Sequence, residues 1–113
     1  GDAAHLNAPS GGMGLNGGIH DAFELAAALN AILREGAETN RLQLYDKRRR
    51  PVARDQIIAQ ADANRARMRE KDDAKRHEML ARLKAITQDR DLLYAHLLRT
   101  SMIEGLRLSS TIN

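Results

Sequence analysis

Apolar residues recur at three- and four-residue intervals through most of the chain, which is the spacing of one face of an α-helix. The first such stretch begins at about Asn16 and has two adjoining faces, with alanines filling the gaps between them. The faces consist of Ile19, Phe23, Ala26 and Asn30 and of Leu25, Leu29, Ile32 and Leu33. A helix that is apolar all round normally lies inside a larger body, so we expect a buried helix that Gly36 ends.

A second helical stretch follows, with Thr39 or Asn40 placed to cap its first turn. It continues through Leu42, Leu44 and Tyr45 to four consecutive basic residues, 47–50, and then meets Pro51. Proline lacks an N–H and clashes with the preceding turn. We therefore expect the helix to kink or restart at Pro51 and to resume at about Val52.

The second half of the chain carries two further apolar stripes, separated by the almost entirely charged segment 69–77. The stripes consist of Ile57, Ala61, Asn64 and Met68 and of Met79, Leu83, Ile86, Leu93 and Leu97, with Asp89 or Asp91 marking a break. Asp72 and Lys75 fall near the seam, so a continuous coiled coil is excluded. We expect antiparallel helices packed on a larger body, followed by a tail, 100–113, that is either helical or merely packed.

The composition favours an all-α fold, because strand-forming residues are scarce. Val52 is the only valine, and aromatic residues make up 3% of the chain. We predict a glycine-rich N-terminal loop followed by three to five helices. The absence of cysteine excludes disulfide scaffolds and thiolate metal sites. The apolar runs are too short to cross a bilayer, and no signal-peptide pattern opens the chain, so we expect a cytoplasmic protein without membrane contact.

The net charge of +3 conceals an asymmetry between the two halves of the chain. Residues 1–46 carry six acids and two bases, which gives −4, whereas residues 47–113 carry sixteen bases and nine acids, which gives +7. A basic half is typical of a helical module that binds nucleic acid or an acidic protein, but interleaved acids are typical of a solvated face. We favour the solvated face, and interpret Lys47 to Arg50 with Arg54 as a surface or domain contact. His20, His77 and His96 lack metal-site spacing, so we predict no metal.

The segment Gly12-Met13-Gly14-Leu15-Asn16-Gly17 matches the G-x-G-x-x-G pattern, and six of the eight glycines lie in residues 1–18. The usual dinucleotide fingerprint requires a strand immediately before the loop, and the preceding residues 7–11 cannot form one, so that interpretation is rejected. A glycine-rich loop entering a helix still leaves main-chain N–H groups free. Gly14, Leu15 and Asn16 either present these donors to an anionic ligand or belong to a loop that only turns the chain.

The N-terminal part of the chain contains a long motif, with many specific residues at specific spacings. It reads Gly1-Asp2-Ala3-Ala4-His5, then Pro9, then Gly11-Gly12-Met13-Gly14-Leu15-Asn16, then Gly18-Ile19-His20-Asp21-Ala22 and Leu25. This run closely resembles the second FAD-binding motif of the aromatic-ring hydroxylases, the single-component flavoprotein monooxygenases of the para-hydroxybenzoate hydroxylase type. The resemblance covers about residues 1–35, and Tyr45, Arg49, Arg50 and Pro51 look more loosely like the next helix of that family.

The resemblance implies an enzyme that uses FAD, NAD(P)H and O2 to hydroxylate a small aromatic substrate. It implies that Asp2 accepts a hydrogen bond from a ribityl hydroxyl of FAD. The main chain of Gly14, Leu15 and Asn16 would face the pyrimidine edge of the flavin, and Gly12 belongs to the same cofactor-binding set. Pro9 would line the substrate side of the ring. His5 could suggest a general base, but we favour a loop histidine that is hydrogen-bonded to the backbone. We interpret Asp21 as an acid that complements the helix dipole.

The family's first FAD motif and its substrate-binding sheet have no counterpart in this sequence. We therefore expect the C-terminal part of a larger enzyme with an α/β FAD-binding fold. In it, residues 1–36 would form the second FAD motif and a buried helix, and residues 37–113 a helical region. The expected partner is the missing N-terminal part of the same enzyme, and a homodimer is possible, whereas nucleic acid is not expected. The isolated chain should be inactive.

Overall fold

The computed structural model describes residues 1–113, and they form helices and connecting loops without a strand. The elements are η1 (Pro9–Gly11), α1 (Gly14–Glu35), α2 (Asn40–Val52), the π-helix η2 (Ala53–Ile58), α3 (Ala59–Arg69), α4 (Asp73–Gln88), α5 (Arg90–Thr100) and α6 (Ile103–Thr111). Because α2, η2 and α3 follow one another without a gap, the chain forms five separate helical rods. The all-α prediction of three to five helices after an N-terminal loop is confirmed.

The first helix begins at Gly14, two residues before the predicted start, and ends as the sequence predicts. Gly36 takes a left-handed conformation with φ of 71°, and its N–H donates to the carbonyl of Ala31. A side chain would be strained at that φ, which explains why a glycine occupies the position. Thr39 occupies the N-cap position of α2, as predicted, but its side chain makes no capping hydrogen bond.

The prediction that the helix restarts at Pro51 is wrong. Pro51 lies inside α2, which continues through the π-helix η2 into α3 as far as Arg69. A proline in a helix interior removes one hydrogen bond and crowds the carbonyl four residues earlier. The wider π turns that follow at once absorb the irregularity without ending the rod.

The later helices begin at aspartate residues. Asp72 accepts a hydrogen bond from the Lys75 N–H at the start of α4, and Asp89 accepts from the N–H groups of Asp91 and Leu92 at the start of α5. Both are standard N-caps, because a carboxylate oxygen pairs with donors that have no partner inside the helix. The predicted break at Asp89 is confirmed, and the tail whose conformation the sequence left open forms α6.

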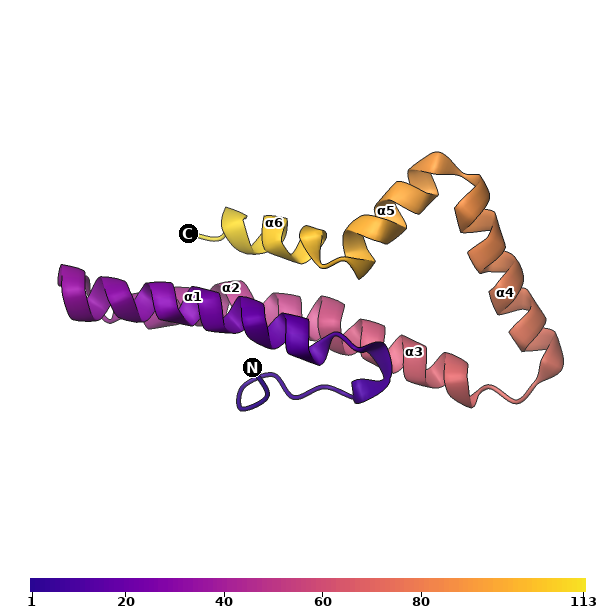
Figure 1. Cartoon of the computed structure of the whole chain (residues 1–113), viewed down its shortest axis with the longest axis horizontal. Coiled ribbons are helices and arrows are strands. Elements are labelled where there is room, and N and C mark those ends of the chain that lie inside the picture. The colour runs from indigo at the N-terminus through magenta and orange to yellow at the C-terminus, as the bar shows by residue number, and fades with distance from the viewer.

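Figure 1 shows α1 lying beside the long rod of α2, η2 and α3, which runs in the opposite direction. From the end of α3 the chain turns away into α4, returns through α5 and brings α6 back along α2 (Figure 1). The molecule measures 59 × 29 × 16 Å, and its radius of gyration is 17.3 Å. A compact domain of this length would have a radius of gyration of about 13 Å. The chain is therefore an open arrangement of helices.

A small core joins the N-terminal loop to the C-terminal tail. Its apolar cluster consists of Met13, Val52, Ile57 and Met102, from four different parts of the chain. Gly17 allows α1 to approach η2 closely, since a Cβ there would lie 2.6 Å from Ile57 Cδ1. Only 11 of 113 residues are buried, so the core of the chain is small.

The prediction that α1 is buried does not hold within this chain. Phe23 is 76% exposed and Leu33 is 78% exposed, and Leu15, Ile19 and Leu29 are also exposed. A run of large apolar side chains on one helix marks a surface that another body covers. None of the helices combines the length and apolarity needed to cross a membrane.

Candidate functional site

The N-terminal loop folds back along one face of the first two turns of α1. A Cβ at Gly18 would lie 3.7 Å from the Cα of Gly1, and one at Gly14 would lie 3.0 Å from Asn7 Oδ1. At the far end of the loop, the Ser10 hydroxyl donates to the carbonyl of Ala61 in α3 at 2.8 Å. The loop is thus held between α1 and α3, and the glycines on α1 leave room for it.

The first turn of α1 presents three main-chain donors without a partner in the chain. The first N–H of this helix to find a carbonyl is that of Gly17, which donates to Met13 at 2.9 Å. The N–H groups of Gly14, Leu15 and Asn16 precede it, and the N-cap residue Met13 supplies no side-chain acceptor. Leu15 and Asn16 are exposed. The positive end of the helix dipole is therefore open to a negatively charged or electron-rich ligand.

The other predicted site residues lie on the loop and are open to solvent. Asp2 is exposed and makes no hydrogen bond, so its carboxylate is free to accept one from a ligand. Gly12 is exposed with φ of 64°, and nothing lies within 4 Å of the place where a Cβ would be. Pro9 is exposed on η1, which packs against α3. The structure brings Asp2 close to the first turns of α1 through the contact of Gly1 with Gly18.

A buried charge network lies one turn further along α1, at Asp21. Its Oδ1 accepts from Arg49 Nε at 2.7 Å, and its Oδ2 lies 2.9 Å from His5 Nδ1 and 2.7 Å from the Gly1 nitrogen. Asp21 is 3% exposed and Arg49 is fully buried. Because an ionised carboxylate only accepts hydrogen bonds, His5 Nδ1 carries the proton in this contact. One carboxylate thus joins the loop, α1 and α2.

The electrostatics of this network favour the ionised carboxylate. Burial alone would raise the pKa of Asp21, but hydrogen bonds from His5, the Gly1 nitrogen and Arg49, with the Arg49 charge, lower it to about 2. His20 directly precedes Asp21, and burial together with the nearby Arg49 charge lowers the pKa of His20. Nη1 and Nη2 of Arg49 are buried without a hydrogen-bond partner. Such groups are costly to leave unpaired, and the bond from Nε to Asp21 is the one side-chain hydrogen bond that this guanidinium makes.

The sequence interpretation missed this network. His5 contacts a carboxylate where we expected backbone, and Asp21 accepts three hydrogen bonds besides lying in the early turns of a helix. Arg49 was expected in a surface or domain contact with the rest of the basic cluster, yet it is fully buried within this chain. The signal that could have revealed it is its position: Arg49 lies four residues after Tyr45 and three before Val52, on the apolar stripe of α2.

A small cavity lies beside the first turns of α1, between this helix and the junction of α5 with α6. Its volume is about 160 Å³, and Asn16, His20, Ser101 and Met102 are among its lining residues. Sites that enclose drug-sized ligands usually measure about 300–1,000 Å³. The cavity is too small to enclose a flavin ring, so a cofactor at this end of α1 would lie on an open surface of the chain.

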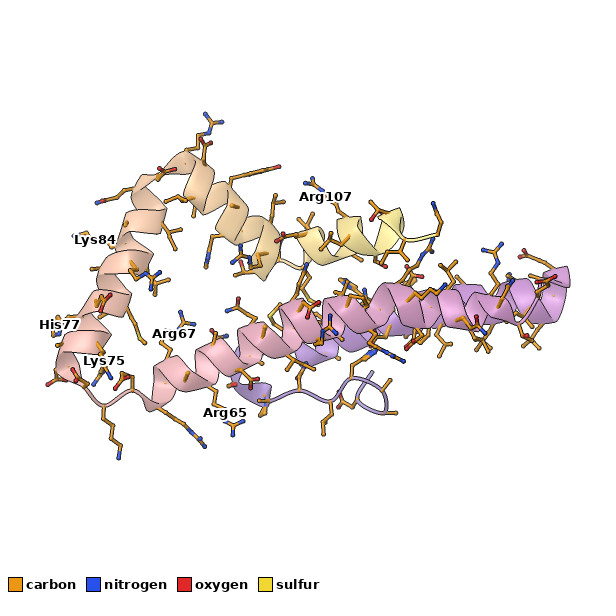
Figure 2. The ribbon with its side chains drawn as sticks, turned by 180° about the vertical axis from the view of Figure 1, so that it is seen from behind. Arg65, Arg67, Lys75, His77, Lys84 and Arg107 are labelled. Carbon is orange, nitrogen blue, oxygen red and sulfur yellow. The ribbon has the colours of Figure 1, made fainter.

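The basic side chains of the second half do not gather into one surface. Figure 2 shows Arg65 and Arg67 leaving α3 on different sides, Lys84 pointing away from the outer side of α4, and Arg107 leaving α6. Arg50, Arg54 and Arg99 form ion pairs with Asp46, Asp55 and Glu104. This pattern is that of a solvated helical surface. No three histidine, aspartate or glutamate side chains are close enough together to hold a metal ion.

Comparison with known proteins places the N-terminal half in one family. The family model described as FAD binding domain matches residues 1–61. The chain is 40% identical over 108 residues to the para-nitrophenol 4-monooxygenase of Pseudomonas sp. (strain WBC-3), a match that covers 96% of this chain and 27% of that relative. The chain thus spans about a quarter of the length of this curated relative.

Other relatives match about half of the chain. The rifampicin monooxygenase of Rhodococcus hoagii is 49% identical over 55 residues, which is 49% of this chain and 12% of that protein. The pentachlorophenol 4-monooxygenase of Sphingobium chlorophenolicum is 45% identical over 53 residues, which is 47% of this chain and 10% of that protein. No solved structure matches the chain. The residues that the family model matches, 1–61, contain the loop, α1 and the charge network.

Proposed function

Because the chain belongs to the family of FAD binding domains, we propose that it forms the flavin-facing part of a monooxygenase that hydroxylates an aromatic substrate with NAD(P)H and O2. The observation that carries the proposal is the open first turn of α1, with three free main-chain N–H groups at its positive end. The exposed and unpaired carboxylate of Asp2 lies on the adjoining loop. These donors and this acceptor fit two chemically different parts of a flavin, the carbonyl oxygens of its pyrimidine edge and its polyhydroxyl chain.

The first turn of α1 would stabilise the reduced cofactor. FAD, when bound, supplies the electron transfer and oxygen chemistry of such an enzyme. The N–H groups of Gly14, Leu15 and Asn16 would point at the pyrimidine edge of the ring, where negative charge develops on reduction. A helix N-terminus stabilises this charge without reorganisation, because its dipole is fixed in advance.

The loop would fix the cofactor and one wall of the substrate site. Asp2 would accept a hydrogen bond from a ribityl hydroxyl, since a carboxylate is a pure acceptor. Gly12, with no atom near its Cβ position, would let the ring approach the main chain. Pro9, on the short helix held against α3, would line the substrate side and help to exclude water from the reacting atoms.

The rest of the site would come from the N-terminal part of the same enzyme. The exposed apolar side chains of α1 require a cover, and the family relatives are several times longer than this chain. We propose that residues 1–36 belong to the flavin domain of the complete enzyme and residues 37–113 to a helical region. A homodimer, in which a second copy of the enzyme packs on the outer helices, remains a prediction.

Replacing Leu15 with proline tests this function. Leu15 is the second residue of α1, where proline is tolerated and removes one of the three N–H donors. In the complete enzyme that contains this chain, Leu15→Pro should weaken binding of oxidised FAD several-fold, since one hydrogen bond to a neutral group contributes about 0.5–1.5 kcal/mol. The bound flavin should also become harder to reduce. Flavin fluorescence titration and redox titration measure the two effects.

Leu15→Ala is the matched control, because it removes the side chain and keeps the N–H. It should bind FAD like the wild type and retain NAD(P)H oxidation coupled to hydroxylation of a phenol. If the wild-type enzyme copurifies without flavin, or if Leu15→Pro and Leu15→Ala behave alike, the proposal is wrong.

A further inference from the structure

We propose that His5, Asp21 and Arg49 act as positioning residues that hold the flavin-binding loop against α1, so that FAD affinity depends on side chains that do not touch FAD. The inference rests on the proposed function and extends it to a set of buried residues behind the site. His5 and Gly1 lie on the loop, Asp21 on α1 and Arg49 on α2. Their shared carboxylate is the charged contact at which these three segments meet.

The position of Asp21 on α1 explains how it can act on the loop. Gly14, Gly18 and Asp21 are spaced i, i+4, i+7 and therefore lie on one face of the helix. The loop crosses this face, with Asn7 against Gly14 and Gly1 against Gly18. Asp21 forms the polar end of a stripe that is otherwise made of glycine. It is therefore placed to set how close the loop comes to the helix.

The loop has two anchors, and they lie at its two ends. One is the network at Asp21, which holds Gly1 and His5. The other is the hydrogen bond from Ser10 to the Ala61 carbonyl, which holds η1 on α3. Asp2 lies three residues before His5 of the first anchor, and Gly12 lies two residues after Ser10 of the second. Loss of the first anchor should therefore displace Asp2 while the helices and the second anchor stay in place.

Arg49 and His5 have different roles in the network. Arg49 is fully buried and connects α2 to α1 through Asp21, so its removal leaves a buried carboxylate without its main partner. His5 is only partly buried and connects the loop to the same carboxylate, so its removal leaves the helix pair intact. A change at His5 should therefore affect the cofactor, whereas a change at Arg49 should affect both the cofactor and the fold.

The experiment compares His5→Ala, His5→Asn and Arg49→Met in the complete enzyme that contains this chain. The readouts are the FAD dissociation constant, the visible circular dichroism of the bound flavin and the Tm of the apoprotein. His5→Ala should weaken FAD binding about tenfold and change the dichroism, with an apoprotein Tm close to that of the wild type. In His5→Asn the side-chain amide nitrogen takes the place of Nδ1, so FAD affinity should be largely restored. Arg49→Met should lower both FAD affinity and Tm.

Arg50→Met is the matched control, because Arg50 neighbours Arg49 on the same helix but forms an exposed pair with Asp46 at 2.7 Å. It should change none of the three readouts. If His5→Ala binds FAD like the wild type, or lowers the apoprotein Tm as much as Arg49→Met does, the positioning role is overturned. A wild-type enzyme that binds no FAD would instead overturn the proposed function and this inference together.

Discussion

At the scale of single residues, the ionisation of Asp21 makes stability depend on pH. The pKa of this carboxyl is about 2 in the folded chain, below its ordinary value of 3.8. A lowered folded-state pKa contributes stability that is fully present above the unfolded pKa and is lost as pH falls through the folded pKa. The window for this loss therefore runs from about pH 4 down to about pH 2.

Asp21→Asn should remove this contribution, because an amide does not ionise. The difference of nearly two pH units corresponds to about 2 kcal/mol of unfolding free energy at neutral pH. Denaturant unfolding at pH 7 and at pH 3 should show a smaller loss of stability on acidification for the variant than for the wild type. Equal losses in the two proteins would show that Asp21 is not part of the acid response.

Residue chemistry also decides what the sequence could reveal about the site. The free donors in the first turn of α1 could be predicted because a glycine-rich loop entering a helix has direct consequences for backbone N–H groups. The role of Asp2 followed only from the family resemblance, and its contact with FAD stays a prediction. The ion pair of Asp21 with Arg49 joins residues 28 positions apart, and neither local spacing nor composition specifies such a pairing. Arg49 also stood among other basic residues, where a solvated side chain is the usual expectation.

At the scale of helices, two neighbouring glycines of α1 should respond in opposite ways to alanine. A Cβ at Gly17 would lie 2.6 Å from Ile57 Cδ1, whereas one at Gly18 would meet only the Gly1 Cα, at the ordinary distance of 3.7 Å. Gly18→Ala should stabilise the chain by about 0.5–1 kcal/mol through helix propensity. Gly17→Ala should instead destabilise it by about 1–2 kcal/mol through overpacking.

Thermal unfolding of the two variants measures this contrast directly. Adding Ile57→Val to Gly17→Ala removes the clashing Cδ1 and should recover part of the lost stability. If Gly17→Ala is as stable as Gly18→Ala, α1 and η2 do not pack as closely as the structure indicates.

The helices themselves could be predicted well from the sequence, with one exception. Gly36 and Asp89 mark ends that depend on local chemistry, and both were found. Pro51 led to a wrong prediction because the local rule for proline takes no account of packing between distant parts of the chain. Val52 and Ile57, directly after the proline, are buried in the core, so packing holds the rod together through η2. Burial of that kind depends on distant partners such as Met102, and no window of sequence contains them.

At the scale of the whole molecule, the open shape predicts how the isolated chain should behave. Few residues are buried and many large apolar side chains are exposed, so the chain alone should bind hydrophobic dyes and self-associate. If the rest of the enzyme completes the proposed flavin site, the isolated chain should be colourless after purification. Dye fluorescence, analytical ultracentrifugation and the visible absorption spectrum measure these properties. A yellow, flavin-loaded monomer would show that the chain completes the cofactor site by itself.

The contact of Met102 with the start of α1 has a consequence for chimeras made from this chain and its relatives. The match to the family model covers residues 1–61 and stops short of Met102. Met102, at the start of α6, nevertheless packs with Met13 and lies beside Gly17, under the open first turn. A chimera that joins the first half of this chain to another relative's tail would keep every motif residue. It would still lose the Met102 side chain that packs against those residues, unless the new tail supplies an equivalent side chain.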